Sequence, residues 1–271
     1  MSNAPQAMQA GPVVIEAKHD GIATLVMNRP DRLNALNNEL AVAINEALAR
    51  IAQDDSVRVV VITGGGRAFC AGGDLAALGK GRQTGRTQDL EPILRAGMQM
   101  VLKMRTMPQP VIAAVNGPAA GAGMNIALAA DIRIAAEEAT FGQNFVKVGL
   151  FPDYGGMFLL PQLVGPAKAA ELFYTGDMLD AKTALDLGIV NKVVPASQLE
   201  AEVKALAEKI AHGPSLPIRA VKKDLFAREE KELARALDNE VQEQIRCYLS
   251  EDCKEGIQAF FERRPPKFQG K

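Results

Sequence analysis

The feature that most constrains the fold is the continuous apolar run VRVVVITGG, residues 57–65, which has the length of a strand and ends in glycines. An unbroken apolar run of this length is typical of a strand buried on both faces. Similar runs recur in QPVIAAVNGPAAGAG, DIRIAAEEATFG and LGIVNKVV, and the last of them follows a helical stretch, DAKTALDLG. Strands that alternate with helices predict an α/β fold with a parallel or mixed sheet.

The N-terminal part of the chain adds a hairpin and a helix. The stretch VVIEAKHDGIATLVMNRP, residues 13–30, predicts two short strands around a turn at residues 19–21. A helix is expected from about Asn38, with Asn37 as its N-cap, because a short polar side chain accepts a hydrogen bond from the free N–H groups there. Its apolar face repeats at helical spacing and consists of Leu40, Ile44, Leu48 and Ile51.

The pattern changes near residue 198, so we divide the chain into a core over residues 13–198 and a helical region over residues 199–271. No low-complexity linker separates them, and we expect the helical region to pack on the core or on a neighbouring subunit. The polar stretch GKGRQTGRTQDLE, residues 79–91, predicts a mobile loop. The first residues lack the charged and apolar regions of a signal peptide, and we expect them to lie outside the fold.

Composition excludes several classes of protein. The formal net charge of −1 gives no overall attraction to nucleic acid or to an anionic membrane, and no stretch reaches the roughly 18 to 20 apolar residues of a membrane-spanning helix. Cys70, Cys247 and Cys253 are too few for a disulfide framework and indicate a reducing, cytoplasmic setting. His19 and His212 lack metal-ligand spacing, so no metal is expected.

Two glycine-rich turns follow predicted strands, GGGRAFCAGGDL at residues 64–75 and NGPAAGAGMNIALAAD at residues 116–131. Glycines let the backbone approach a ligand closely, and free N–H groups at the start of a helix attract negative charge. Neither turn matches a P-loop or the dinucleotide fingerprint. Each turn is either a simple connector or one half of a site that binds a developing oxyanion.

An isolated acid, Asp153, lies in the apolar stretch VGLFPDYGGMFLLP, residues 148–161. Burying a carboxylate among such neighbours is costly unless the carboxylate is used or paired. Two interpretations remain open from the residues alone. Asp153 caps the helix that follows, or it transfers a proton with a pKa that its surroundings have raised.

Five stretches together resemble the crotonase superfamily, the enoyl-CoA hydratases and isomerases, over residues 13–269. They are NRPDRLNAL, GGGRAFCAGGDL, NGPAAGAGMNIALAADIRIAAEEATFG, GLFPDYGGMFLLPQLVG and EDCKEGIQAFFERRPPKFQG. The resemblance implies a spiral of repeated ββα units with a C-terminal helical region, assembled as a homotrimer or a dimer of trimers. It also implies an acyl-CoA thioester as the substrate, with coenzyme A as part of that substrate and no separate cofactor.

The same resemblance implies the chemistry. The N–H groups of Gly73 and Ala122 would stabilise a thioester enolate, whereas the two glutamates of a hydratase are replaced by Asn125 and Phe145. The stretch GLFPDYG is similar to that of isomerases with an acid at Asp153, such as the 1,2-epoxyphenylacetyl-CoA isomerase branch of phenylacetate degradation. An enoyl-CoA isomerase is therefore favoured; the alternatives are a hydratase or other crotonase-type enzyme, and a non-catalytic acyl-CoA binder.

Further substrate contacts are expected from the resemblance and from the position of the motifs. The candidate substrate-binding residues are Arg32, Leu33, Ala35, Ala71, Gly72, Asp74, Leu75, Asn125, Phe145 and Tyr154. Arg32 either meets a phosphate or is a solvated loop residue, and Tyr154 either lines the pocket or packs in the core. We expect a basic rim at the site, formed by Lys222, Lys223, Arg263, Arg264 and Lys267.

Overall fold

The structure, a computed structural model, describes residues 11–84, 88 and 90–271, so the first ten residues and the middle of the polar stretch 79–91 lie outside the described part. The strands are β1 (Val14–His19), β2 (Ile22–Met27), β3 (Val59–Gly64), β4 (Val111–Val115), β5 (Ala119–Ala120), β6 (Ile132–Ala136), β7 (Thr140–Gly142), β8 (Met178–Asp180) and β9 (Lys192–Val194). The α-helices are α1 (Asn38–Ala52), α2 (Leu75–Gln83), α3 (Leu90–Thr106), α4 (Ala122–Ala129), α5 (Gly156–Thr175), α6 (Ala181–Asp186), α7 (Ala196–Ala211), α8 (Ser215–Phe226), α9 (Glu230–Leu249) and α10 (Glu251–Glu262). The short 3-10 helices η1 (Pro30–Arg32) and η3 (Asn144–Val148) complete the description.

The main sheet has the strand order β1-β2-β3-β4-β6-β9, and β5, β7 and β8 form a smaller sheet. In the main sheet the β1–β2 hairpin is antiparallel, whereas β2, β3, β4, β6 and β9 pair in parallel. This confirms the predicted α/β class with a mixed sheet. The stretch DIRIAAEEATFG, expected as one strand, forms β6 and β7, which separate into different sheets.

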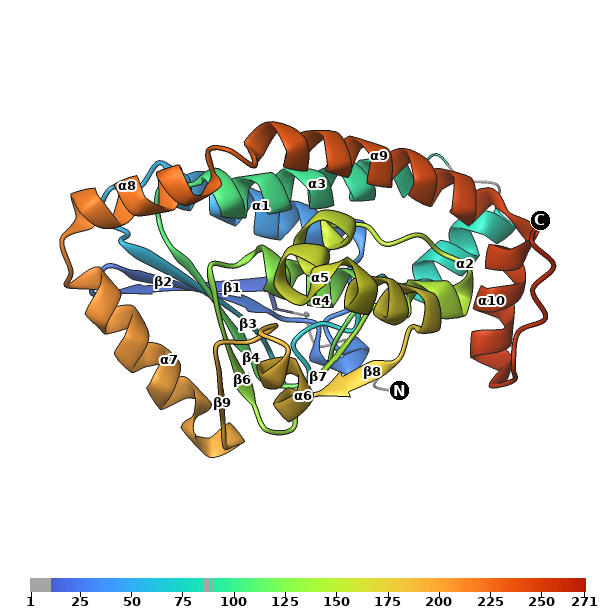
Figure 1. Ribbon diagram of the computed structural model, residues 1–271, viewed down its shortest axis with the longest axis horizontal. Helices are drawn as coiled ribbons and strands as arrows, with labels where there is room; N and C mark the ends of the chain where they lie inside the picture. The colour runs from blue at the N-terminus through green and yellow to red at the C-terminus, as the bar shows by residue number, and fades with distance from the viewer. Residues whose placement is uncertain (1–10, 85–87, 89) are drawn as a thin grey trace, which may run out of the picture.

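Both faces of the main sheet are covered, which explains the unbroken apolar run in β3. Val59 and Val61 point into an apolar cluster with one face of α7, whereas Val60 and Ile62 belong to the larger core cluster. Figure 1 shows α7 on one side of the sheet and α1 with α3 on the other. A strand between two helical layers has no face for polar residues, so its sequence does not alternate.

Helix α1 begins as its sequence predicts. The Asn37 side chain accepts a hydrogen bond from the Leu40 N–H at 2.9 Å, which satisfies one of the free donors at the helix start. The expected apolar face, residues 40, 44, 48 and 51, is fully buried. The N-terminal hairpin and α1 thus form a unit of two strands and a helix, and β4, β5 and α4 repeat the order.

The prediction of a mobile loop over residues 79–91 is wrong for most of the residues that the structure describes there. Helix α2 continues to Gln83, and α3 begins at Leu90. Asp74 starts α2 by accepting a hydrogen bond from the Ala77 N–H at 3.2 Å. The glycines and polar residues of this stretch have low helix propensity, so the sequence did not predict the helix. The Asp74 N-cap and tertiary contacts stabilise it.

The helical region begins at Ala196, three residues before the expected boundary, and is tied to the core by buried polar contacts. Lys222 of α8, expected on a basic rim, is buried instead. Its ammonium group donates to the carbonyl oxygens of Met104 and Gln109 and to the Asp131 carboxylate, at 2.7, 2.8 and 2.8 Å. Burial lowers the Lys222 pKa, and the three acceptors compensate for the loss of water.

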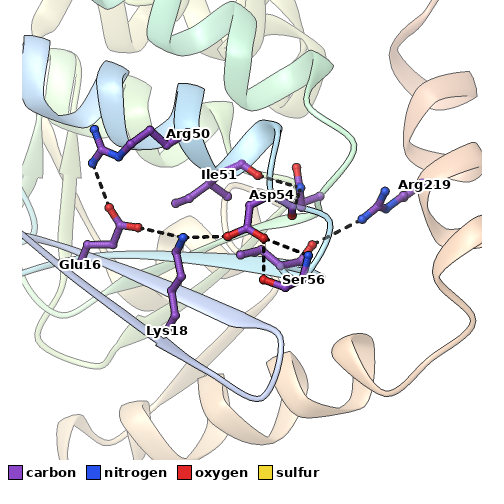
Figure 2. Close-up of polar contacts among 9 residues, drawn as sticks. Glu16, Lys18, Arg50, Ile51, Asp54, Ser56 and Arg219 are labelled. Atoms are coloured by element: carbon purple, nitrogen blue, oxygen red, sulfur yellow. Dashed lines mark hydrogen bonds and ion pairs between the residues drawn. The ribbon is translucent and has the colours of Figure 1, made fainter.

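Surface ion pairs link the same layers. Figure 2 shows Lys18 of β1 donating to Asp54, at 2.9 Å, in the turn after α1. Arg219 of α8 bonds to the neighbouring Asp55 at 3.1 Å. Hydrogen bonds from Ser56 and Lys18 lower the Asp54 pKa to about 2. Among the helices of the described residues, none combines the length and the hydropathy needed to cross a membrane.

Candidate functional site

A cavity of about 1320 Å³ lies between the two glycine-rich turns and helices from distant parts of the chain. Its walls come from α2, α3, η3, α9 and α10, so both the core and the helical region contribute. Most of the residues expected at the site line it, namely Arg32, Leu33, Ala35, Ala71, Gly72, Gly73, Asp74, Leu75, Ala122, Phe145, Asp153 and Tyr154. Asn125 is the exception.

The two glycine-rich turns lie directly against each other. Gly72, at a φ of 92°, approaches so closely that a Cβ there would lie 2.8 Å from the Ala120 carbonyl oxygen. A Cβ at Gly123 would lie 2.1 Å from the Cys70 carbonyl oxygen. Side chains at either position would separate the turns, so the glycines bring Gly73 and Ala122 to one cavity.

Two main-chain N–H groups in these turns have no main-chain acceptor within the described residues. Ala122 is the first residue of α4, so its N–H has no acceptor within the helix. Leu36 forms main-chain hydrogen bonds with Gly72 and Asp74, the two neighbours of Gly73. The N–H of Gly73 itself has no main-chain acceptor within the described residues. Such N–H pairs are suited to stabilising negative charge on an oxygen.

The loop before α1 is held in place by Asn34, which the sequence analysis did not identify. Leu33 and Asn34 both have left-handed backbone, at φ values of 51° and 57°. The buried Asn34 amide donates to the carbonyls of Gly65, Ala68 and Phe69 at 2.9, 2.8 and 3.2 Å. This asparagine therefore fixes the loop against the first glycine-rich turn and offsets the cost of its backbone conformation.

Asp153 is buried at the cavity wall, with a relative exposure of 7%. Its Oδ2 accepts a hydrogen bond from the Gln244 side chain at 2.9 Å, and its Oδ1 has no hydrogen-bond partner within the described part of the chain. Burial raises the Asp153 pKa to about 7, and hydrogen bonds from Gln244 and from the main-chain N–H of Asp153 itself oppose that rise. A carboxyl with such a pKa can both take up and release a proton near neutral pH.

The alternative in which Asp153 caps a helix is wrong. Helix α5 starts after Gly155, and no local side chain caps it. Its first N–H groups are satisfied by Glu240 of α9, whose carboxylate accepts from Gly155 at 2.7 Å and from Met157 at 3.0 Å. The Asp153 carboxylate is therefore not needed for capping.

Asn125, expected to contact substrate, lies behind the cavity wall and is fully buried. Its amide donates to the Asp153 carbonyl oxygen at 2.6 Å and accepts from Gln143 at 2.6 Å. A Cβ at Gly156 would lie 2.4 Å from the same amide, so α5 packs closely on it. Asn125 holds the turn that carries Asp153.

Phe145 and Tyr154 are buried side chains that form apolar parts of the cavity wall. The Phe145 ring lies close to Gly121, where an added Cβ would be 3.4 Å from it. Tyr154 has a φ of 53°, and its ring packs on α3 where Gly97 leaves room. Burial raises the Tyr154 pKa well above its ordinary value, so the phenol stays neutral.

Other chemical groups near the cavity are already paired or exposed. Asp74 bonds to Arg29 at 3.0 Å in addition to capping α2, whereas Glu39 lies at the exposed rim. Burial raises the Cys70 pKa to about 12, so the thiol stays neutral. Arg264 lines the cavity but is paired with Glu255 at 2.8 Å. Of the described carboxyls at the wall, Asp153 alone combines deep burial with an unpaired oxygen.

The sequence did not predict Glu240 and Gln244 as residues of the site. Glu240 lies 85 residues from Gly155, which it binds, and Gln244 lies 91 residues from Asp153. A signal was nevertheless present in α9. Its buried face consists of Leu233, Leu237, Glu240, Val241, Gln244 and Tyr248. Two polar residues, one helical turn apart, interrupt an otherwise apolar stripe, and such residues need partners when buried.

The fold and the cavity define an α/β protein in which two adjoining glycine-rich turns and one buried acid line the same cavity. Comparison with known proteins agrees with this class. A family model described as Enoyl-CoA hydratase/isomerase matches residues 17–271. The chain belongs to this family, the crotonase superfamily, and is an enzyme of the crotonase type that acts on acyl-CoA thioesters.

Individual relatives differ in the activity for which they are named. The chain is 40% identical to a probable enoyl-CoA hydratase of Rhodobacter capsulatus, over 93% of this chain and 96% of that protein. It is 39% identical to a 1,2-epoxyphenylacetyl-CoA isomerase of Escherichia coli, over the same shares. A crystal structure of an enoyl-CoA hydratase from Mycobacterium avium subsp. paratuberculosis superimposes with a TM-score of 0.86 at 34% identity, covering 95% of this chain and 98% of that one. The fold is therefore the α/β crotonase fold of ββα units with C-terminal helices.

Proposed function

We propose that this enzyme is an enoyl-CoA isomerase that moves a double bond, or carries out a related rearrangement through an enolate. The observation that carries the proposal is the Asp153 carboxyl, which is buried at the cavity wall with Oδ1 unpaired. Its pKa of about 7 suits a group that takes a proton and returns it.

In the proposed reaction, the thioester oxygen accepts hydrogen bonds from the Gly73 and Ala122 N–H groups. Asp153 Oδ1 removes a proton from the carbon next to the thioester carbonyl. The C–H bond breaks, an O–H bond forms on Asp153, and the electron pair moves onto the thioester oxygen as an enolate. Oδ1 then returns a proton to a carbon further along the acyl chain, and this proton can have exchanged with solvent while the enolate is bound. One N–H donor of this kind is worth about 3 to 4 kcal/mol in the transition state.

The remainder of the cavity supports an acyl-CoA ligand. We assign the loop with Leu33 and Ala35 and the turn from Ala71 to Leu75 to the coenzyme, and Phe145 and Tyr154 to the acyl group. Arg32, Lys80 and Lys147 also line the cavity and are cations that suit phosphate groups.

A hydratase is the second candidate, because the Rhodobacter capsulatus relative is named as a probable one. Adding water requires groups that activate it and deliver its proton. The residues at the two expected glutamate positions do not supply them, since Asn125 is committed to the Asp153 turn and Phe145 has no exchangeable proton. Rapid loss of conjugation when crotonyl-CoA is mixed with the protein would favour the hydratase.

The third candidate is a non-catalytic acyl-CoA binder, which would also lack both glutamates. Deuterium exchange separates it from the enzyme. A binder would hold acyl-CoA in deuterium oxide without exchange at the carbon next to the thioester, whereas the proposed isomerase would exchange that position. The unpaired Oδ1 of Asp153 favours exchange.

The test of the proposal is Asp153→Asn, which keeps the shape of the side chain and removes its proton transfer. We expect isomerisation of a 3-enoyl-CoA to fall by about 100- to 10,000-fold, with acyl-CoA affinity within a few-fold of the original. Asp238→Asn, an exposed change on α9, is the control and should leave both values unchanged. An unaltered isomerase rate in Asp153→Asn would reject the assignment.

We also propose a homotrimer or a dimer of trimers in a reducing, cytoplasmic setting. Large apolar side chains remain exposed on α8 and at the end of α5, including Leu216, Leu225 and Tyr174. Such patches are typical of subunit contacts. The three cysteines are free thiols, which fits a reducing compartment.

A further inference from the structure

Gln244 of α9 is bonded at both ends of its side-chain amide. It is buried, with an exposure of 3%. The carbonyl oxygen accepts from the Phe151 N–H at 2.9 Å, and the NH₂ group donates to Asp153 Oδ2 at 2.9 Å. A main-chain N–H can only donate, so the amide oxygen must face Phe151 and the NH₂ group must face Asp153.

This fixed orientation makes the two oxygens of Asp153 unequal. An NH₂ group cannot accept a proton, so Oδ2 keeps its lone pair for Gln244. Oδ1 is buried and has no side-chain partner within the described residues, and Asp153 lines the cavity. We infer, on the basis of the proposed function, that Gln244 is a positioning residue that reserves Asp153 Oδ1 for the transferred proton.

The backbone around Asp153 is held independently, which leaves the side-chain orientation to Gln244. Glu240, one helical turn before Gln244, binds the N–H groups of Gly155 and Met157. Asn125 binds the Asp153 carbonyl from the opposite side. The main chain is thus fixed from α9 and α4, and Gln244 supplies the described side-chain hydrogen bond to the carboxylate.

The positioning role of Gln244 can be measured as a shift of the Asp153 pKa, provided that the other titratable groups around Asp153 are known. Glu240 faces the turn from α9, Tyr154 is the next residue, and Cys70 lies in the first glycine-rich turn. The phenol and the thiol stay neutral because burial raises the pKa of each, and burial also raises the Glu240 pKa, to about 8. The Gln244 hydrogen bond lowers the Asp153 pKa, so its loss should move that pKa upward.

The experiment compares Gln244→Glu and Gln244→Met in the full-length protein. Gln244→Glu keeps an acceptor for Phe151 but replaces the NH₂ donor by a titratable carboxyl, whose negative charge also raises the Asp153 pKa. Gln244→Met keeps the volume without hydrogen bonds or charge and is the decisive variant. We expect the acid limb of the kcat pH profile, near pH 7 in the original enzyme, to move up by about one pH unit or more in both variants. At pH 7, kcat should fall by about fivefold or more, with KM within about twofold.

Gln242→Met, an exposed change two residues away, should keep the original profile. A purely structural role for Gln244 would reduce the amount of folded protein without moving the pH profile, and that outcome in both variants would overturn the inference. If one variant does not fold, the pH profile of the other decides. Asp153→Asn separates the two proposals. If it stays active, the proposed function fails, and if it is inactive while both Gln244 variants behave as the original enzyme, only the positioning role fails.

Discussion

Asp153 is held where its charged form is unfavourable, and this has a cost for the folded protein. Its pKa is about 7 in the folded state and 3.8 in its ordinary state. Below pH 3.8 the carboxyl is protonated whether the chain is folded or unfolded, so there is no cost. As the pH rises towards 7, the unfolded chain loses the proton first, and the folded state becomes less stable relative to it. The proposed catalytic acid is thus a local source of instability at neutral pH.

Asp153→Asn should therefore be more stable than the original protein at pH 8 and equally stable near pH 3.8. The neutral amide removes the burial of a charge and can still accept from Gln244. The gain in the free energy of unfolding is up to about 4 kcal/mol above pH 7. Urea unfolding at a series of pH values measures it. A stability difference that does not change with pH would contradict the raised pKa, and Asp238→Asn is the exposed control.

At the scale of elements, α3 packs against the turn before α5 at Gly97, where the missing side chain leaves room for the Tyr154 ring. A Cβ added at Gly97 would lie 2.2 Å from the Tyr154 ring. The ring cannot retreat easily, because Glu240 and Asn125 fix the backbone on either side of Tyr154. The contact between these elements therefore sets the position of a cavity wall.

Gly97→Ala should displace the Tyr154 ring, destabilise the protein by about 1–3 kcal/mol and raise KM for acyl-CoA. Urea unfolding and steady-state kinetics measure the two effects. Removing the ring provides the control: in the Gly97→Ala, Tyr154→Ala double variant the added methyl group no longer meets an obstacle. The two changes should then be less damaging together than the sum of their separate effects. Strict additivity would mean that the contact is not the cause.

Elements with local signals were predictable from the sequence, and those held by distant partners were not. The unbroken run in β3 and the Asn37 cap of α1 both depend on neighbouring residues, and both predictions are confirmed. Helix α2 was mistaken for a loop because its glycines and polar residues have weak helix propensity. The turn carrying Asp153 depends on Glu240 and Gln244, whose contacts across the fold have no short-range pattern.

At the scale of the whole molecule, the helical region completes the site. Helix α9 carries the two residues that hold the Asp153 turn, and α10 forms part of the cavity wall. Figure 1 shows α9 lying along α3, with α10 at the end of the molecule beside α2. The division at residue 198 therefore separates sequence patterns, while one site draws on both parts.

The proposed trimer accounts for apolar side chains that the single chain leaves in water. On α8, Leu216 is 82% exposed and Leu225 is 62% exposed, although buried Lys222 fixes the same helix on the core. A rigid helix with exposed leucines favours a contact between subunits.

Light scattering should give a mass three or six times the 29.0 kDa of one chain, and Leu225→Asp should lower that mass at micromolar concentration. Glu200→Lys, an exposed change on α7, should not. A mass of one chain for the original protein, or an unchanged assembly in Leu225→Asp, would place this surface outside any subunit contact.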